Sequence, residues 1–111
     1  MLHTAVLLSA AALAIAAPAP ADLSTTGTDE FVSLCARDRM ACGNFVANVM
    51  EFLEAAAGFN EIQSYQVCAP NPFGDREIDA ILGWIRANPG RARGVAADAI
   101  GAAGEVLWPC R

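Results

Sequence analysis

The sequence contains no lysine and only one histidine, His3, among its 111 residues. We expect His3 to be removed with a leader peptide, which leaves the working protein without either residue. A chain without histidine lacks the general base of serine and cysteine triads and the imidazole ligands of many metal sites. These absences exclude a large share of hydrolase and metalloenzyme chemistry before any motif is considered.

Positive charge is also scarce. The sequence has seven arginines and twelve acidic residues, which gives a net charge of −5. Nucleic-acid binders and proteins that read anionic membranes carry a basic surface, and this composition argues against both partners. Most of the negative charge lies before residue 62, where it either faces a basic partner or simply keeps the protein soluble.

The chain has one long apolar run, Ala5 to Ala17, close to its start. Its length suits the central region of a signal peptide, and Ala19-Pro20-Ala21 supplies the small residues that signal peptidase recognises. A membrane anchor would need about 20 strongly apolar residues. We therefore expect residues 1–21 to be a signal peptide, and the released protein to be periplasmic or secreted, with no membrane attachment.

All four cysteines, Cys35, Cys42, Cys68 and Cys110, lie after the expected cleavage point. An even number of cysteines in a short exported chain is typical of disulfides. A zinc site of cysteines usually shows paired C-x-x-C spacing, which is absent here. We expect two disulfides, no metal and no cofactor.

Three pairings are open, and we favour Cys35–Cys42 with Cys68–Cys110. Seven residues of continuous helix would separate the first two Cα atoms by about 10 Å, too far for a disulfide. This pairing therefore requires a break in the helix, for which the polar residues Arg37-Asp38-Arg39 are the best place. If the helix continues through them, the pairing must differ.

Hydrophobic spacing after the leader is that of helices rather than strands. Residues 22–28 are small and polar, a flexible lead-in to a single domain over residues 29–111. Between residues 59 and 72 the pattern is weaker, and residues 62–67 are either a short helix or extended. We expect four helices. The first is capped by Thr28 and carries Phe31 and Cys35, and the second is Met40–Ala57, ended by Gly58. The third is capped by Asp75 and stops at Asn88-Pro89, and the fourth is Val95–Leu107. The predicted fold class is all-α, a small bundle of four to five helices stapled by two disulfides.

The remaining candidates for catalysis are carboxylates, hydroxyls and the single tyrosine, Tyr65. Glu51 and Glu54 are one helical turn apart, and so are Asp75 and Asp79. Paired carboxylates serve glycosidases, but such pairs on helices of an acidic protein usually form a solvated face. We therefore expect no catalytic residues and no enzyme activity.

The order of these features resembles the Rap/Tai family of exported immunity proteins, which is associated with type VI secretion and its peptidoglycan-amidase toxins. The resemblance covers residues 28 to 110 and rests on several elements in order. They are the leader, Phe31-Val-Ser-Leu-Cys35, Cys42 at the start of an apolar helix, Cys68-Ala-Pro70, a helix ended by Asn88-Pro89, and Trp108-Pro109-Cys110.

The resemblance implies a helical periplasmic protein that binds a cell-wall amidase toxin and covers its active site. Whether the protein also forms a homodimer is left open. For partner contact we consider the loop from Ala69 to Gly74, especially Asn71, Phe73 and Gly74. The other candidate is the connection from Phe59 to Tyr65, especially Tyr65. Loops on a stapled scaffold suit insertion into a cleft. The alternative is a periplasmic acid-stress chaperone, which would expose apolar surface once its carboxylates are neutralised.

Overall fold

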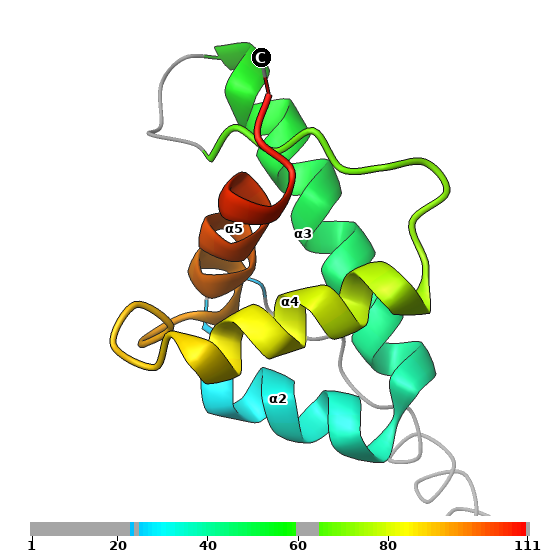
Figure 1. Cartoon of the computed structure of the whole chain (residues 1–111), viewed down its shortest axis with the longest axis vertical. Helices are drawn as coiled ribbons and strands as arrows, with labels where there is room; N and C mark the ends of the chain where they lie inside the picture. The colour runs from blue at the N-terminus through cyan, green and yellow to red at the C-terminus, as the bar shows by residue number, and fades with distance from the viewer. Residues whose placement is uncertain (1–22, 24, 60–64, 111) are drawn as a thin grey trace, which may run out of the picture.

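A computed structural model describes residue 23, residues 25–59 and residues 65–110 of the protein, with the main chain alone for residues 55–59. The expected signal peptide lies outside these residues. Within them the chain forms four helices and no strand, which confirms the predicted all-α class (Figure 1). The helices are α2 (Thr28–Arg37), α3 (Arg39–Phe59), α4 (Asp75–Ala87) and α5 (Ala96–Leu107).

The prediction that Thr28 caps the first helix is wrong by one residue, because the N-cap of α2 is Gly27. The Gly27 N–H donates to Glu30 Oε1 at 3.3 Å, so a side chain from the first turn reaches back to the cap. Thr28 is buried instead, and its N–H and hydroxyl both donate to the Gly94 carbonyl, at 2.9 and 3.1 Å. Gly94 has a φ of 81°, a left-handed conformation that favours glycine.

The cap of α4 is shifted in the same way, from the predicted Asp75 to Gly74. Here the Gly74 N–H donates to Glu77 Oε1 at 2.8 Å, while Asp75 lies in the first turn near the positive end of the helix dipole. The predicted stop is confirmed, since α4 ends at Ala87 and Asn88 is its C-cap.

A single residue, Asp38, separates α2 from α3, where the sequence predicts a break. Its carboxylate accepts a hydrogen bond from the Ala41 N–H at 3.0 Å, in the first turn of α3. The break brings the Cα atoms of Cys35 and Cys42 to 4.7 Å, and the two residues form a disulfide. Cys68 and Cys110 form the other, so the favoured pairing is confirmed.

Helix α3 is longer than predicted, because it begins at Arg39 and continues through Gly58 to Phe59. A glycine weakens a helix by about 1 kcal/mol relative to alanine, but it ends one only where the backbone turns left-handed. The apolar stripe of the preceding turns keeps α3 on the core. The prediction that Gly58 ends the helix is therefore wrong.

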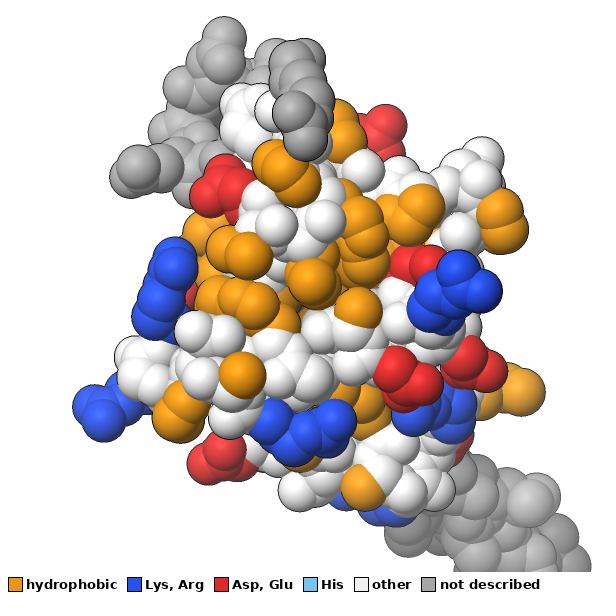
Figure 2. Space-filling view, viewed as in Figure 1, with side chains coloured by type: hydrophobic (Ala, Val, Ile, Leu, Met, Phe, Trp, Pro, Cys, Tyr) orange, Lys and Arg blue, Asp and Glu red, His pale blue; other side chains and the backbone are white. Residues whose placement is uncertain are grey.

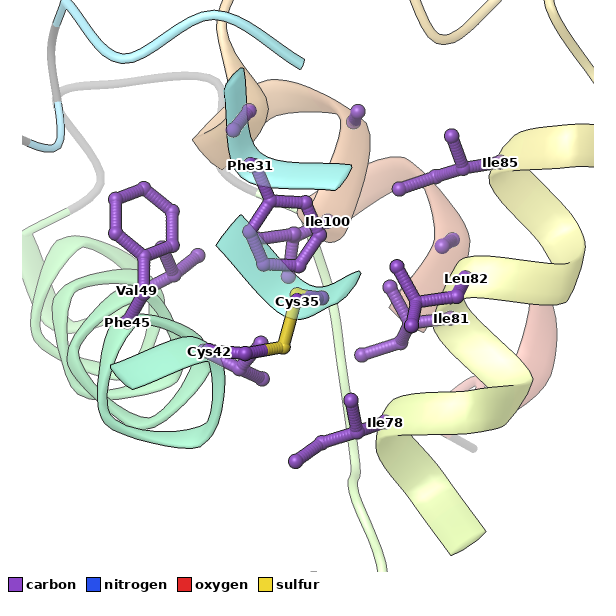
Figure 3. Close-up of a cluster of buried hydrophobic side chains, with 14 of the residues drawn as sticks. Phe31, Cys35, Cys42, Phe45, Val49, Ile78, Ile81, Leu82, Ile85 and Ile100 are labelled. Atoms are coloured by element: carbon purple, nitrogen blue, oxygen red, sulfur yellow. A yellow bond between two sulfur atoms is a disulfide. The ribbon is translucent and has the colours of Figure 1, made fainter. Parts of the chain in front are cut away.

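The four helices enclose one hydrophobic core. Phe31 from α2 and Phe45 from α3 meet with their ring centroids 5.4 Å apart, and Ile100 from α5 is fully buried. Figure 3 shows the disulfide of Cys35 and Cys42 among these side chains. The stripe of α4 closes the core from one side with Ile78, Ile81, Leu82 and Ile85.

The segment that leads into α2 is paired with the segment that leads into α5. Gly27 forms an isolated antiparallel bridge with Val95, and the Ala96 N–H donates to the Thr26 carbonyl at 2.8 Å. The last residues of the expected lead-in are thus hydrogen-bonded to the body of the domain. This pairing holds the starts of α2 and α5 next to each other.

Candidate functional site

The candidate contact residues lie where the chain before α4 meets the chain after α5. We call residues 65–74 together with residues 107–110 the stapled surface. Cys68 and Cys110 are joined with their Cα atoms 5.1 Å apart, and the Cys68 N–H donates to the Trp108 carbonyl at 2.8 Å. Val67 and Pro109 form an antiparallel bridge between the two segments. A covalent bond and a backbone pairing therefore fix the two segments to each other.

Tyr65 lies on α5, with its ring against the main chain of Gly101. A methyl group at Gly101 would come within 2.3 Å of the ring, so only glycine allows this contact. The Tyr65 hydroxyl donates to Asp98 Oδ1. This hydrogen bond, together with burial and the negative charges of Asp98 and Glu105, raises the pKa of Tyr65 to about 12, with Arg91 opposing the shift. Tyr65 is therefore a protonated donor at neutral pH.

Val67 repeats this contact one helical turn further along α5. Its methyl groups lie 2.9 and 3.0 Å from where a side chain at Gly104 would begin. Between the two contacts, the Gln66 N–H donates to Glu105 Oε2 at 2.9 Å. The many small residues of α5 predict tight packing against a helix, but the two glycines are covered by an extended segment.

The loop from Ala69 to Gly74 is only partly available for contact. Asn71 is exposed, and its peptide bond to Pro72 is cis. Phe73, expected at the apolar tip of the loop, is half-buried and packs edge-on against Trp108 with ring centroids 5.5 Å apart. Gly74 is exposed at the cap of α4.

The structure thus brings Phe73 to the C-terminal segment, and Tyr65 to α5. Residues 60–64 of the connection, which was also considered for contact, lie outside the described residues.

A groove of about 430 Å³ separates the stapled surface from α3. Its lining consists of Met50, Leu53, Glu54, Tyr65, Gln66, Val67, Cys68, Ala69 and Cys110. Figure 2 shows hydrophobic side chains gathered over the end of α5 and the neighbouring segments above α4, with acidic side chains at the border. Sequence reasoning missed the contribution of α3, because Met50 and Leu53 follow the apolar pattern of core residues. The wall on the stapled surface could have been recognised in the sequence from Tyr65, Val67 and Ala69, which occupy every second position and therefore share one side of an extended segment.

A second, larger groove of about 750 Å³ lies between the start of α2 and the turn after α4. One wall carries Asp29 and Glu30, and the other carries Arg86 and Arg93. The Arg91 guanidinium lies nearby over the Trp84 ring, 5.6 Å from its centroid. Trp84 is half-buried against the core. This groove has a mixed charge, in contrast to the more apolar groove beside α3.

The groups considered for catalysis or metal binding are the paired carboxylates and the cysteines. The described residues contain no group of three or more histidine, cysteine or acidic side chains placed to hold a metal ion. The two predicted carboxylate pairs are exposed, and Asp79 forms an exposed ion pair with Arg39 at 2.9 Å. All four cysteines are in disulfides. Among the helices in the described part of the chain, none combines the length and hydropathy needed to cross a membrane.

No family model, curated protein or solved structure matches the chain. The resemblance to the Rap/Tai family therefore rests on the ordered residues described above. Two intramolecular disulfides are typical of an oxidising compartment, periplasmic or extracellular.

Proposed function

We propose that this chain is an exported binding protein that blocks a peptidoglycan-amidase toxin in the periplasm, in the manner of the Rap/Tai immunity proteins. Inhibition would be stoichiometric, because the inhibitor covers the active site of the toxin and carries out no chemistry itself. The observation that carries the proposal is the stapled surface, a partly apolar region held rigid by the Cys68–Cys110 disulfide.

Rigidity supports a binding role because a partner then does not have to order the surface on docking. Cys68 is fixed by its disulfide and by the hydrogen bond to Trp108, and Phe73 is held against the Trp108 ring. Asn71 projects from this support as an exposed residue. An interface of ordinary size buries about 800 Å² on each partner, which is attainable for a domain of this size.

The chemistry of the described residues also supports binding rather than turnover. The high pKa of Tyr65 makes it a poor general base at neutral pH. The four cysteines are held in disulfides, and the predicted carboxylate pairs face solvent. Each of these groups has a structural role or a solvated position that requires no substrate.

The direct test is inhibition of an amidase encoded next to this gene. The purified chain, with both disulfides formed, is titrated against the amidase while peptidoglycan hydrolysis is followed. We expect activity to fall linearly to zero at a ratio of one to one. Full hydrolysis with an excess of the chain, or the absence of an amidase gene from the neighbourhood, would count against the proposal.

A pair of asparagine variants tests where the toxin binds. Asn71→Arg places a long charged side chain on the exposed loop, and we expect it to weaken inhibition at least about tenfold by steric and electrostatic mismatch within the proposed interface. Asn48→Arg makes the same change on the exposed face of α3 and should leave inhibition unchanged. Equal effects of the two variants would remove the loop from the contact surface.

The acid-stress chaperone is supported by one observation. The carboxylates of Asp98 and Glu105 hold Tyr65 and Gln66 on α5, so the cover over the glycines of this helix depends on two hydrogen bonds to acidic side chains. Release of this segment would uncover the glycines of α5 and the apolar groove. Light scattering by an aggregating client protein at low pH, with and without the chain, separates the two functions, because an immunity protein has no reason to suppress it.

A further inference from the structure

The segment from Tyr65 to Ala69 has one paired edge and one unpaired edge. The N–H groups of Gln66 and Cys68 donate to Glu105 and Trp108, so the backbone groups of the even-numbered residues point toward α5 and the C-terminal segment. In an extended chain the N–H and C=O groups of successive residues point to opposite sides. The backbone groups of Val67 and Ala69 therefore point away, and among the described residues nothing hydrogen-bonds to them.

This unpaired edge belongs to a segment that is already held in the extended conformation. Val67 lies opposite Pro109 in an antiparallel bridge whose hydrogen bond is made by its neighbour Cys68 to Trp108. Cys68 is also joined to Cys110, and the Tyr65 ring is seated on α5. An exposed strand edge is a template for pairing with another extended chain. Because the segment Tyr65–Ala69 is already ordered, binding costs only the conformational entropy that the partner strand loses.

The groove beside this edge has a defined chemistry. Met50 and Leu53 of α3 form its apolar wall, and Glu54 is the charged residue in its described lining. Glu51, one turn earlier on the same helix, is also exposed. The groove therefore suits an apolar side chain next to a cationic one.

We propose that the partner adds an extended segment to the free edge of Tyr65–Ala69, with an apolar side chain in the groove and a lysine or arginine opposite Glu54. This inference names the mode of binding for the proposed function and rests on it for the identity of the partner. The partner segment pairs its main chain with Val67 and Ala69, so its side chains alternate between the groove and solvent. We therefore expect the sequence of the partner segment to contain an apolar residue and a basic residue within a few positions of each other.

The test is selection from a random library of short linear peptides displayed on phage, against the purified chain with both disulfides intact. Selected peptides are synthesised, and their contacts are mapped by NMR on the labelled protein. We expect enriched peptides that combine apolar and basic residues, with the largest amide shifts at Val67 and Ala69. An N-methyl group at alternate peptide nitrogens should weaken binding about tenfold or more, because it removes the backbone donors.

Two matched pairs of variants separate the backbone and charge contributions. Val67→Pro removes the N–H, whereas Val67→Ala keeps it, and both lose the packing on Gly104. We expect peptide binding to be about tenfold weaker for Val67→Pro than for Val67→Ala. Glu54→Gln should weaken binding of basic peptides about two- to fivefold, while Glu51→Gln, outside the groove lining, should not.

Failure of the inference differs from failure of the proposed function. If no peptide is enriched, if N-methylated peptides bind equally well, or if the shifts map to the groove between α2 and α4, the edge is not a binding site. An amidase blocked at one to one would still support the immunity function in that case. Conversely, peptides that dock on Val67 and Ala69 support the edge even if the neighbouring amidase is not inhibited.

Discussion

At the scale of single residues, Tyr65 shows how a contact that holds two segments together can perturb the acidity of a side chain. Its hydroxyl donates to the Asp98 carboxylate, and ionisation would place two negative charges side by side. The pKa rises to about 12 from an ordinary value of 10.0. A perturbed pKa often marks an active site, but here the partner carboxylate is structural, since it holds the segment before α4 on α5.

Because Tyr65 is the only tyrosine, the absorbance of tyrosinate reports on this residue alone. We expect the native protein to titrate with a midpoint near 12, and Asp98→Asn to lower that midpoint toward 10. Asp75→Asn, in the first turn of α4, should leave it unchanged. A midpoint near 10 in the native protein would show that the hydrogen bond to Asp98 is not formed.

The same shift sets the direction of a pH effect on stability. The pKa of Tyr65 in the folded state exceeds its value in the unfolded state. The protonated hydroxyl therefore contributes to the free energy of unfolding below pH 10, and this contribution is lost as the pH rises toward 12. We expect the melting temperature to fall across this range in the native protein, and to fall less in Tyr65→Phe. An identical decline in both proteins would contradict the assignment.

At the scale of elements, the glycines of α4 and α5 occupy opposite environments. Gly83 in α4 has no heavy atom within 4 Å of an added methyl group, whereas Gly101 in α5 has the Tyr65 ring at 2.3 Å. Both lie inside helices, where glycine is the weaker helix former. Their sequence context does not separate them, because the distinction depends on a segment more than thirty residues away from Gly101.

Alanine substitutions at these two sites should therefore have effects of opposite sign. Gly83→Ala should stabilise the protein by up to about 1 kcal/mol through helix propensity. Gly101→Ala should destabilise it by about 1–3 kcal/mol, because Tyr65 has to move. Chemical denaturation measures both, and stabilisation by Gly101→Ala would mean that the ring does not rest on α5 in solution.

Much of the fold could be predicted from apolar spacing, because that pattern records which helix face is buried. The stripe of Ile78, Ile81 and Ile85 predicts α4 and its buried face, and the polar residues Arg37-Asp38-Arg39 predict the break needed by Cys35–Cys42. The helix caps were misplaced at Thr28 and Asp75. In both cases a glycine precedes the polar residue, and a glutamate three residues after the glycine bonds back to it.

The candidate site was less predictable because it is built from contacts between distant segments. Nothing local to Phe73 shows that it packs against Trp108, and nothing local to Gly104 shows that Val67 covers it. The apolar character of Met50 and Leu53 predicts burial, and it does not distinguish a groove wall from a core. The favoured cysteine pairing, by contrast, follows from expecting the helix to break at Arg37-Asp38-Arg39, since an unbroken helix would hold Cys35 and Cys42 too far apart.

At the scale of the whole molecule, the two disulfides have different tasks. Cys35–Cys42 closes a separation of seven residues and lies within the core, with Cys42 fully buried. Cys68–Cys110 closes a separation of 42 residues, and both of its cysteines are exposed. The long link should constrain the unfolded chain more, because loop-closure entropy grows with the length of the loop.

We expect the double variant Cys68→Ser and Cys110→Ser to lose about 4 kcal/mol of unfolding free energy, the chain-entropy value for a loop of this length. Serine suits these exposed positions, so loss of packing adds little. For Cys35→Ala with Cys42→Ala the entropic share is about 2 kcal/mol, and loss of buried sulfur adds to it. Urea denaturation under non-reducing conditions measures both, and a loss below about 1 kcal/mol for the exposed pair would contradict the model of a staple.

The position of Cys110 also orders events during biogenesis. The partner of Cys42 lies only seven residues before it, so that bond can close before the later residues are available. Cys68 has to wait until residue 110 has arrived. A polypeptide that ended before that residue would carry an unpaired thiol at position 68, and its reactivity would distinguish the unfinished copy from the complete one.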